Sequence, residues 1–456
     1  MKITFLGAGS TGFAKNVMGD VMLCPALCDA ELALYDIDPV RMQESFTLID
    51  RMNNVINAGR ATIKIYVGVE NRREALQGAD FVICCVQVGG YKPCTVIDFE
   101  VPKKYGLQQT IGDTMGIGGI FRALRTIPVL RDFAEDIEAV CPNALLLHYS
   151  NPMAMLSGFI QRFTNVKSVG LCHSVQVCAP RLLKALEIAT PNQDPSIPAW
   201  DVDLNDPIWN DYKVTIAGIN HMAWLLELRD KAGTDLLPEV RKRARARTAA
   251  GKHDDMVRYD YIDKLGYYCT ESSIHNAEYN PFYLKANRPD LLEKYNITPD
   301  DYLRRCEDQL VQWAKQYEEL SSGASIQHKR SREYASRIME AIVTNTPLKI
   351  NGNVINRGAI TNLPFEACVE VPCLVDATGI HPTYVGALPT QLAAMNSSNI
   401  YPQMLTIEAA VTHDREKVYQ AAMMDPHTGA QLSTDEIVSL CDDLIEAHTT
   451  ADFPVL

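Results

Sequence analysis

Two groups that could hold a metal ion stand where apolar runs give way to polar residues. Cys172 and His173 follow the run SVGL, and His221 follows the run VTIAGIN. Apolar runs that end in this way are typical of buried strands, so both groups are expected at strand ends. A thiolate from one strand and an imidazole from another can share a divalent cation and leave positions open for substrate oxygens. A packed free cysteine is the alternative interpretation of the residues alone.

A glycine pattern at the start of the sequence predicts a second kind of chemistry. Gly7, Gly9 and Gly12 form GxGxxG directly after the first apolar run. In a strand–turn–helix unit such glycines permit a tight turn, and the helix N-terminus offers backbone donors to a pyrophosphate. Asp36 closes the second run, near the spacing expected of a carboxylate on a ribose 2′-hydroxyl, with Asp38 as the alternative. An acid there repels a 2′-phosphate, so the pattern predicts NAD and not NADP.

Two loops supply the remaining residues assigned to the dinucleotide. Ser10 and Thr11 stand inside the glycine turn. Gln87, Gly89 and Gly90 follow a later apolar run and fit a loop that passes close to the cofactor. An ordinary turn between a strand and a helix is the alternative for this second loop.

The elements that must position these residues follow from the pattern of the first 175 residues or so. Short apolar runs alternate with longer segments of helical periodicity, which predicts a doubly wound, Rossmann-like parallel sheet at 1–190. The strand-like runs are KITFLGAG, ELALYDID, DFVICCVQVGG, ALLLHYSNP and SVGLCHS, and the helical segments include DPVRMQESFTLIDRMNNVI and GGIFRALRTIPVLRDFAEDIEAV.

The rest of the chain, 191–456, mixes helical and strand-like segments and predicts an α+β domain. Residues 191–213 are rich in Pro, Asp, Asn and Trp, which indicates a connection or surface insertion. The segment VTIAGINHMAWLLELRD then predicts a strand with a polar break. Further helices are expected at 302–320, 332–343 and 435–448, and further strands at 348–356 and 367–377.

Composition narrows the class of function. The 456 residues are 47% hydrophobic and 22% charged, an ordinary globular composition for two packed domains. A net charge of -13 repels nucleic-acid phosphates and anionic lipid, which favours small-molecule chemistry over a nucleic-acid or membrane partner. Thirteen scattered cysteines suit a reducing compartment, and the short first run predicts a strand and not a signal peptide. We therefore expect a cytoplasmic protein.

Longer blocks of sequence carry a family resemblance from end to end. In this order they are similar to the NAD- and manganese-dependent glycoside hydrolases of family 4, and especially to their α-galactosidase (melibiase) branch. The N-terminal fold is then expected to be like that of lactate and malate dehydrogenases. The blocks are ITFLGAGSTGF, QVGGYKPCTVIDFEVPKKYGLQQTIGDTMGIGGIFRALRTIP, SNPMAM, GLCHSVQ, AGINHMAW, LGYYCTESSIHNAEYNPF, SREYAS, VEVPCLVDATGIHPTYVGALP and AAMMDPHT.

The resemblance implies an α-galactosidase that needs NAD+ and Mn2+. Most glycoside hydrolases use a pair of carboxylates as their catalytic groups, and the NAD-dependent family 4 is an exception. As implied, sugar C3 is transiently oxidised, the C2 proton is removed, the leaving group is eliminated, water adds and the hydride returns. A cation on the 2- and 3-hydroxyls would make the C2 proton easier to remove. The identity of the metal as Mn2+ is implied by the resemblance and not by the ligands, since Cys and His favour softer metals.

Several site residues carry over from the matching blocks. Cys172 and His221 are the implied metal ligands. His173 is a candidate general acid for the leaving oxygen, or a substrate contact only. Asn151 and Arg332 are implied substrate contacts, although a capping Asn and a structural ion-pair Arg are the alternatives.

The base that removes the C2 proton is assigned to a helix-like segment before a Gly-aromatic pair. Tyr259 is the first candidate and Asp260 the second. A packed helical tyrosine is the alternative for Tyr259. Asp113, His275 and Glu278 also stand in matching blocks; Asp113 is expected near the site, and no role is assigned to the other two.

Other functions stay open on the sequence alone. Within the family the rivals are an α-galacturonidase, an α-glucuronidase and an α-glucosidase. A uronic-acid-specific enzyme is the main one, because one or two residues near sugar C6 could switch a hydroxymethyl site to a carboxylate site. The Pro- and Trp-rich segment at 191–213 departs from the melibiase pattern and affects the sugar and aglycone assignment. Outside the family the rivals are a lactate- or malate-type dehydrogenase and a non-catalytic NAD sensor. The apolar C-terminal helices lead us to expect a homodimer or homotetramer.

Overall fold

The computed structural model describes residues 1–10, 12–192, 197–199, 201–321 and 326–456. Thr11 therefore lies outside the described residues. No helix in the described ranges combines the length and apolar composition that a membrane crossing requires.

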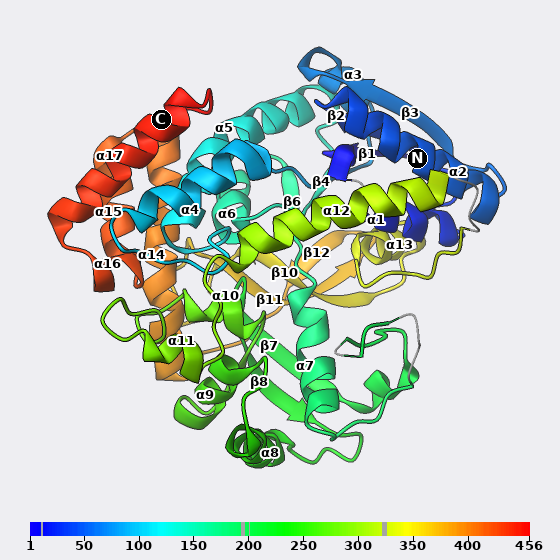
Figure 1. Ribbon diagram of the computed structural model, residues 1–456. Helices are drawn as coiled ribbons and strands as arrows, with labels where there is room; N and C mark the ends of the chain where they lie inside the picture. Colours follow the sequence, from blue (N-terminus) through cyan, green and yellow to red (C-terminus); the bar gives the residue numbers. More distant parts are fainter. Residues whose placement is uncertain (11, 193–196, 200, 322–325) are drawn as a thin grey trace.

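A parallel sheet forms the N-terminal half, and its strands are short and, apart from the edge strand β3, largely buried (Figure 1). Their order in the sheet is β3-β2-β1-β4-β5-β6. This order is that of the doubly wound dinucleotide-binding fold, so the predicted fold class is confirmed. The strands are β1 (Lys2–Leu6), β2 (Glu31–Asp36), β3 (Thr62–Val67), β4 (Phe81–Cys84), β5 (Leu145–His148) and β6 (Lys167–Gly170).

Helices cover both faces of this sheet, which explains why its strands read as continuous apolar runs. Ile3 and Phe5 of β1 belong to one core, which they share with side chains of α1 and α2. Leu6, on the other face, belongs to a second core with α5, α6 and α17. The helices are α1 (Gly12–Leu23), α2 (Pro39–Ile56), α3 (Arg72–Leu76), α4 (Val96–Lys103), α5 (Gly116–Val140), α6 (Met153–Phe163) and α7 (Ser174–Ala185), with α17 (Thr434–Thr450) from the C-terminal end.

The sheet continues into the C-terminal half without a break. After β6 the order is β10-β11-β7-β8-β9, and β12 pairs with β11. The join between the halves is the antiparallel pairing of Gly170 on β6 with Asn353 on β10. The strands are β7 (Lys213–Ile219), β8 (Met222–Arg229), β9 (Tyr268–Cys269), β10 (Leu348–Ile355), β11 (Cys368–Asp376) and β12 (Gly379–Pro382).

Ten helices described by the structure accompany these strands, in keeping with the predicted α+β pattern. In Figure 1, α14, α15 and α17 form one flank of the molecule, beside α4 and α5. The helices not yet given are α8 (Leu237–Ala250), α9 (Met256–Lys264), α10 (Ser273–Ala277), α11 (Asp290–Lys294), α12 (Asp301–Ser321), α13 (Ala335–Thr344), α14 (Thr390–Thr412), α15 (Arg415–Met424) and α16 (Thr428–Gln431).

Two details differ from the sequence prediction. The segment expected as one strand with a polar break is a hairpin, β7–β8, in which Ile219 pairs with Met222. Asn220 and His221 form its turn, and His221 takes a left-handed φ of 63°. The edge strand β3 was not among the predicted strands, because half of its side chains face solvent and its sequence, TIKIYV, mixes polar and apolar residues.

Candidate active site

A row of paired residues crosses the sheet just below the candidate site. Gly170 pairs with Asn353, Asn353 with Glu370, and Glu370 with Gly218. The first residue of this row precedes Cys172 and the last precedes His221. The row therefore brings the end of β6 and the turn after β7 to the same edge of the sheet, although two strands separate them.

Cys172, His221 and Glu271 meet at this edge. One ligand atom from each, the thiol sulfur, a ring nitrogen and a carboxylate oxygen, lies within 4.8 Å of the others. His221 Nε2 is 3.6 Å from Glu271 Oε2, too long for a hydrogen bond. The structure thus brings together the two predicted residues and adds Glu271, which the sequence prediction missed.

The charges of this cluster suit a divalent cation. Burial raises the pKa of the Cys172 thiol to about 12, so the thiolate that binds metal needs a positive charge beside it. Burial alone would raise the pKa of Glu271, but neighbouring histidine rings hold it well below its ordinary value. A sulfur, an imidazole and a carboxylate form a donor set that a divalent cation can accept, with positions left for substrate oxygens.

His173 stands beside the cluster and faces an acid. Its Nδ1 is 3.3 Å from Glu333 Oε1. Burial alone would lower the pKa of His173, but the Glu333 carboxylate raises it above its ordinary value. A ring that keeps its proton at higher pH is suited to giving that proton to a leaving oxygen.

The two predicted sugar contacts are held by acids. Asn151, after β5, donates from Nδ2 to Asp113 Oδ2 at 3.3 Å. The partly exposed Arg332 donates from Nη1 to Asp201 Oδ2 at 3.1 Å. Asp201 belongs to the Pro- and Trp-rich segment at 191–213, so this contact ties a described part of that segment to Arg332. It also accepts from Arg181 of α7 at 2.8 Å.

Tyr259 and Asp260, the two candidates for the base that removes the C2 proton, have contacts with residues outside the cluster. Tyr259 of α9 is buried against the rings of His253, at 4.7 Å, and Tyr268, at 6.2 Å. Burial raises the pKa of Tyr259 well above its ordinary value. Asp260 Oδ2 accepts from the Tyr283 hydroxyl at 3.0 Å. Within the described ranges, no hydrogen bond or ion pair joins either residue to Cys172, His221 or Glu271.

The glycine turn fits a dinucleotide. Gly7 has a φ of 86°, and a Cβ there would lie 2.1 Å from the Cys85 carbonyl oxygen. Gly9 donates its backbone N–H to Asp36 Oδ2 at 2.7 Å. The Ser10 hydroxyl is buried and lacks a partner among the described residues, so it is left for a ligand or water. These features leave a close backbone surface and a carboxylate at the end of β2, as a pyrophosphate and a ribose require.

The remaining predicted cofactor residues have clear local roles. Gly12 begins α1. Gln87 donates from Nε2 to Thr95 Oγ1 at 3.1 Å. Gly89 and Gly90 have positive φ values of 77° and 58°, and they turn the chain at the end of the loop.

Asp38 serves a different purpose from Asp36. Its side chain caps α2 by accepting from two backbone N–H groups, at 2.9 and 3.1 Å. Of the two carboxylates, Asp36 is therefore the one that contacts the glycine turn.

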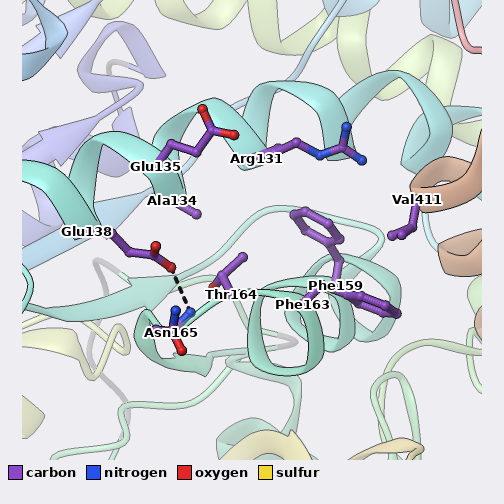
Figure 2. A pocket seen from close by; sticks show the side chains of 9 residues that line it. All are labelled: Arg131, Ala134, Glu135, Glu138, Phe159, Phe163, Thr164, Asn165 and Val411. Atoms are coloured by element: carbon purple, nitrogen blue, oxygen red, sulfur yellow. Dashed lines mark hydrogen bonds between the residues drawn. The ribbon is translucent and has the colours of Figure 1, made fainter.

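A hollow elsewhere in the molecule is separate from this site. It has a volume of about 400 Å³ and lies between the C-terminal parts of α5 and α6. Figure 2 shows Phe159 and Phe163 facing Arg131 and Glu135 across it, with Glu138 bound to the Asn165 backbone. Asn151 precedes the opposite end of α6, so this hollow does not contribute to the candidate active site.

Together, the sheet order, the glycine turn and the polar cluster at the strand ends define a dinucleotide-binding α/β protein with a metal-type donor set. Two family models cover most of the chain, one for family 4 glycosyl hydrolases at residues 2–188 and one for their C-terminal domain at 216–428. The chain belongs to glycosyl hydrolase family 4.

Individual relatives span almost the whole chain. An α-galactosidase of Bacillus subtilis is 54% identical over 98% of this chain and 98% of its own length. An α-galactosidase of Rhizobium meliloti is 34% identical over 98% of this chain and 88% of its own. A solved 6-phospho-α-glucosidase from gut microorganisms, in complex with NAD and Mn2+, has a TM-score of 0.78, 20% identity and 98% coverage of both chains, and it shares the fold.

Proposed function

We propose that this protein is an α-galactosidase that depends on NAD+ and a divalent metal ion, with Mn2+ as the candidate. The observation that carries the proposal is the 54% identity to the Bacillus subtilis α-galactosidase over 98% of both chains. The cluster of Cys172, His221 and Glu271 supports it, because the cluster and the glycine turn both follow strand ends at the same edge of the sheet.

Each predicted residue has a role in this proposal. When bound, NAD+ would take a hydride from sugar C3 and return it, and the cation would polarise the 2- and 3-oxygens of the sugar. Cys172, His221 and Glu271 would hold the cation. Asn151 and Arg332 bind and orient the sugar. His173, which is oriented by Glu333, would donate a proton to the leaving oxygen.

For removal of the C2 proton we propose Tyr259 first and Asp260 second, on the basis of the matching sequence block. The test is hydrogen exchange at C2, measured separately from product release in Tyr259→Phe and Asp260→Asn. The variant that loses the base should lose C2 exchange. If both variants exchange at the wild-type rate, neither residue is the base.

The organisation of the protein is part of the same proposal. Residues 1–190 form the NAD-binding part, and 191–456 supply substrate, metal and oligomer contacts. The molecule is proposed to be a cytoplasmic homodimer or homotetramer, which size-exclusion chromatography with light scattering would test.

The activity can be tested with p-nitrophenyl α-galactoside, NAD+, Mn2+ and a reducing thiol. We expect nitrophenol release that requires both cofactors, without accumulation of NADH, and incorporation of solvent deuterium at C2 of the product. A lactate- or malate-type dehydrogenase would instead accumulate NADH in proportion to product. The same assay with α-galacturonides, α-glucuronides and α-glucosides tests the sugar, and a faster turnover of any of these would overturn the α-galactosidase assignment.

A further inference from the structure

The pairing between β6 and β10 is interrupted at the candidate metal ligand Cys172. In the described part of the chain these two strands share one pair, Gly170 with Asn353. Counting on in the same antiparallel register places Cys172 opposite Asn351, where a direct bond from the Cys172 N–H to the Asn351 carbonyl would extend the ladder. The hydroxyl of Tyr334 stands between these two groups instead.

The Tyr334 hydroxyl makes one hydrogen bond to each strand end, and its partners fix the direction of both bonds. A backbone N–H can only donate, so the hydroxyl accepts from the Cys172 N–H, at 3.0 Å. A carbonyl oxygen can only accept, so the hydroxyl donates its one proton to the Asn351 carbonyl, also at 3.0 Å. The Cys172 carbonyl is farther from the hydroxyl, at 3.4 Å. One hydroxyl therefore replaces one backbone hydrogen bond and holds the two strand ends apart.

Loss of this hydroxyl would leave two backbone groups without a partner. Tyr334 is only 3% exposed, so water has little access to the place that its hydroxyl occupies. Buried backbone N–H and C=O groups are almost always paired, so the strand ends would have to move to find new partners. Such a movement displaces the Cys172 peptide, and the sulfur, two bonds from Cα, is displaced with it.

The segment that carries this hydroxyl is held on both sides. Ser331 donates its backbone N–H and its hydroxyl to the two oxygens of the buried Asp20 of α1, at 2.8 and 2.6 Å. On the other side, the Ala335 N–H donates to the Tyr149 hydroxyl at 3.0 Å. The bridging hydroxyl is therefore a fixed point against which the end of β6 is placed.

Two consecutive residues of this segment hold two consecutive residues of the candidate site. Glu333 Oε1 lies 3.3 Å from His173 Nδ1, and Tyr334 binds the Cys172 N–H. The glutamate acts on a side chain that is proposed to move a proton, whereas the tyrosine acts on the backbone of a proposed metal ligand. A measurement of metal binding therefore reports on the tyrosine contact and not on the glutamate contact.

We propose that Tyr334 is a positioning residue for the metal site: its hydroxyl, inserted between β6 and β10, sets the place of the Cys172 sulfur relative to His221 and Glu271. The three ligand atoms lie within 4.8 Å of one another in this arrangement. Metal–ligand distances tolerate little variation, so a displaced sulfur leaves the reach of a shared cation. The inference rests on the proposed function, in which Cys172 is a metal ligand.

The test measures metal binding and not turnover. Full-length protein, kept reduced, is stripped of metal with EDTA, saturated with NAD+ and titrated with Mn2+ while the free ion is followed by electron paramagnetic resonance. Loss of an outer contact that orients a ligand costs about 10- to 100-fold in metal affinity. We expect a loss of this size in Tyr334→Phe. Its NAD+ affinity, measured by calorimetry, should stay within about twofold of wild type.

Cobalt provides a second readout, which a general loss of stability would not change. A thiolate bound to Co2+ gives a charge-transfer absorption, and Cys172→Ser should abolish it. At saturating Co2+, the absorption in Tyr334→Phe should be weaker than in the wild type, because the sulfur is no longer held at ligand distance. A tyrosine that served only packing would lower the thermal midpoint when replaced and leave this absorption unchanged.

Tyr261→Phe is the matched control for the loss of a buried bridging hydroxyl. The Tyr261 hydroxyl accepts from Asn280 Nδ2 at 2.7 Å and donates to the Asn276 carbonyl at 3.1 Å, so it also joins one N–H to one carbonyl. Neither partner belongs to β6 or β10. The Mn2+ affinity of this variant should stay within about twofold of wild type, and its Co2+ absorption should be unchanged.

A double variant tests whether Tyr334 acts through the sulfur. Tyr334→Phe/Cys172→Ser should bind Mn2+ as Cys172→Ser alone does, because the tyrosine has no effect on the metal once the thiolate is gone. Additive losses in the double variant would overturn the inference. An equal loss of Mn2+ affinity in Tyr261→Phe and Tyr334→Phe would also overturn it.

The remaining results separate the inference from the proposed function. Wild-type Mn2+ affinity and Co2+ absorption in folded Tyr334→Phe overturn the inference and leave the metal role of Cys172 intact. If Tyr334→Phe does not fold, 4-aminophenylalanine at position 334 keeps a donor toward the Asn351 carbonyl and weakens the acceptor for the Cys172 N–H. Reduced Mn2+ affinity in that variant supports the inference, and unchanged affinity overturns it. Wild-type protein that binds no Mn2+ overturns both the inference and the proposed function.

Discussion

Asp36→Asn is expected to weaken NAD+ binding and reduce the preference for NAD+ over NADP+. The Asp36 carboxylate accepts the N–H groups of Gly9 at 2.7 Å and Asp38 at 3.0 Å, one on each oxygen. A carboxylate has about four lone-pair sites, so it can still accept from a ribose hydroxyl. Asparagine has the same shape but one oxygen. Its NH2 group must then face either a backbone N–H or the ribose.

The size of the effect follows from these contacts. A hydrogen bond to a charged group contributes about 1.5–3 kcal/mol. Losing one such bond to the ribose weakens NAD+ binding by about 10- to 150-fold. The substitution also removes the repulsion between the carboxylate and a 2′-phosphate, which amounts to about 1–4 kcal/mol for two unit charges about 4 Å apart. NADP+ should therefore lose less affinity than NAD+, or gain some.

The assay is calorimetric titration of metal-free protein with each dinucleotide. Asp38→Asn is the matched control, because it removes the same charge from the same loop. Asp38 caps α2, and asparagine caps helices about as well as aspartate, so stability and NAD+ affinity should hardly change. Equal losses in the two variants, or an unchanged ratio of NAD+ to NADP+ affinity in Asp36→Asn, would refute the assignment of Asp36 to the ribose.

Three further outcomes are expected. Cys172→Ser should lower Mn2+ affinity at least about tenfold, since a hydroxyl is a poorer ligand than a thiolate. The measurement is a titration with Mn2+ in which the free ion is followed by electron paramagnetic resonance. An affinity equal to that of the wild type would show that Cys172 is not a metal ligand. In metal-free protein, burial raises the pKa of Glu370 to about 7, above the ordinary 4.5. The folded state therefore holds a proton that the unfolded chain releases, and stability should fall by about 3 kcal/mol as the pH rises from about 4.5 past 7. Glu370→Gln should flatten that fall in urea unfolding at pH 5 and pH 8, and an identical pH dependence would contradict the pKa assignment. Gly7→Ala should destabilise the protein by about 1–3 kcal/mol in thermal unfolding, because of the left-handed φ and the Cys85 carbonyl, and unchanged stability would count against this turn geometry.

The parallel sheet could be predicted because its central strands are buried on both faces. Their side chains are apolar in succession, so β1, β2, β4, β5 and β6 stand out without any knowledge of their partners. β3 did not stand out because it is an exposed edge strand. The hairpin β7–β8 was merged into one strand, since a two-residue turn of Asn220 and His221 lacks the glycine that normally marks such a turn.

The sequence predicted those residues of the candidate site that directly follow a recognisable strand. Cys172 and His221 each follow a recognisable apolar run, whereas Glu271 follows β9, which is only two residues long and has no detectable pattern. The one local signal for Glu271 is its left-handed φ of 63°, which is visible only in the structure. The pairing of Gly170 with Asn353 is equally hidden, because nothing near either residue specifies a partner so far away in the chain.

That single join between β6 and β10 has a consequence for how this protein can be divided or recombined. The candidate ligand sulfur is encoded before the Pro- and Trp-rich segment, and the imidazole and carboxylate are encoded after it. A chimera that exchanges the first 190 residues with those of a relative would replace the glycine turn, Asp36 and one of the three candidate metal ligands together. Neither polypeptide piece, expressed alone, would carry a complete donor set.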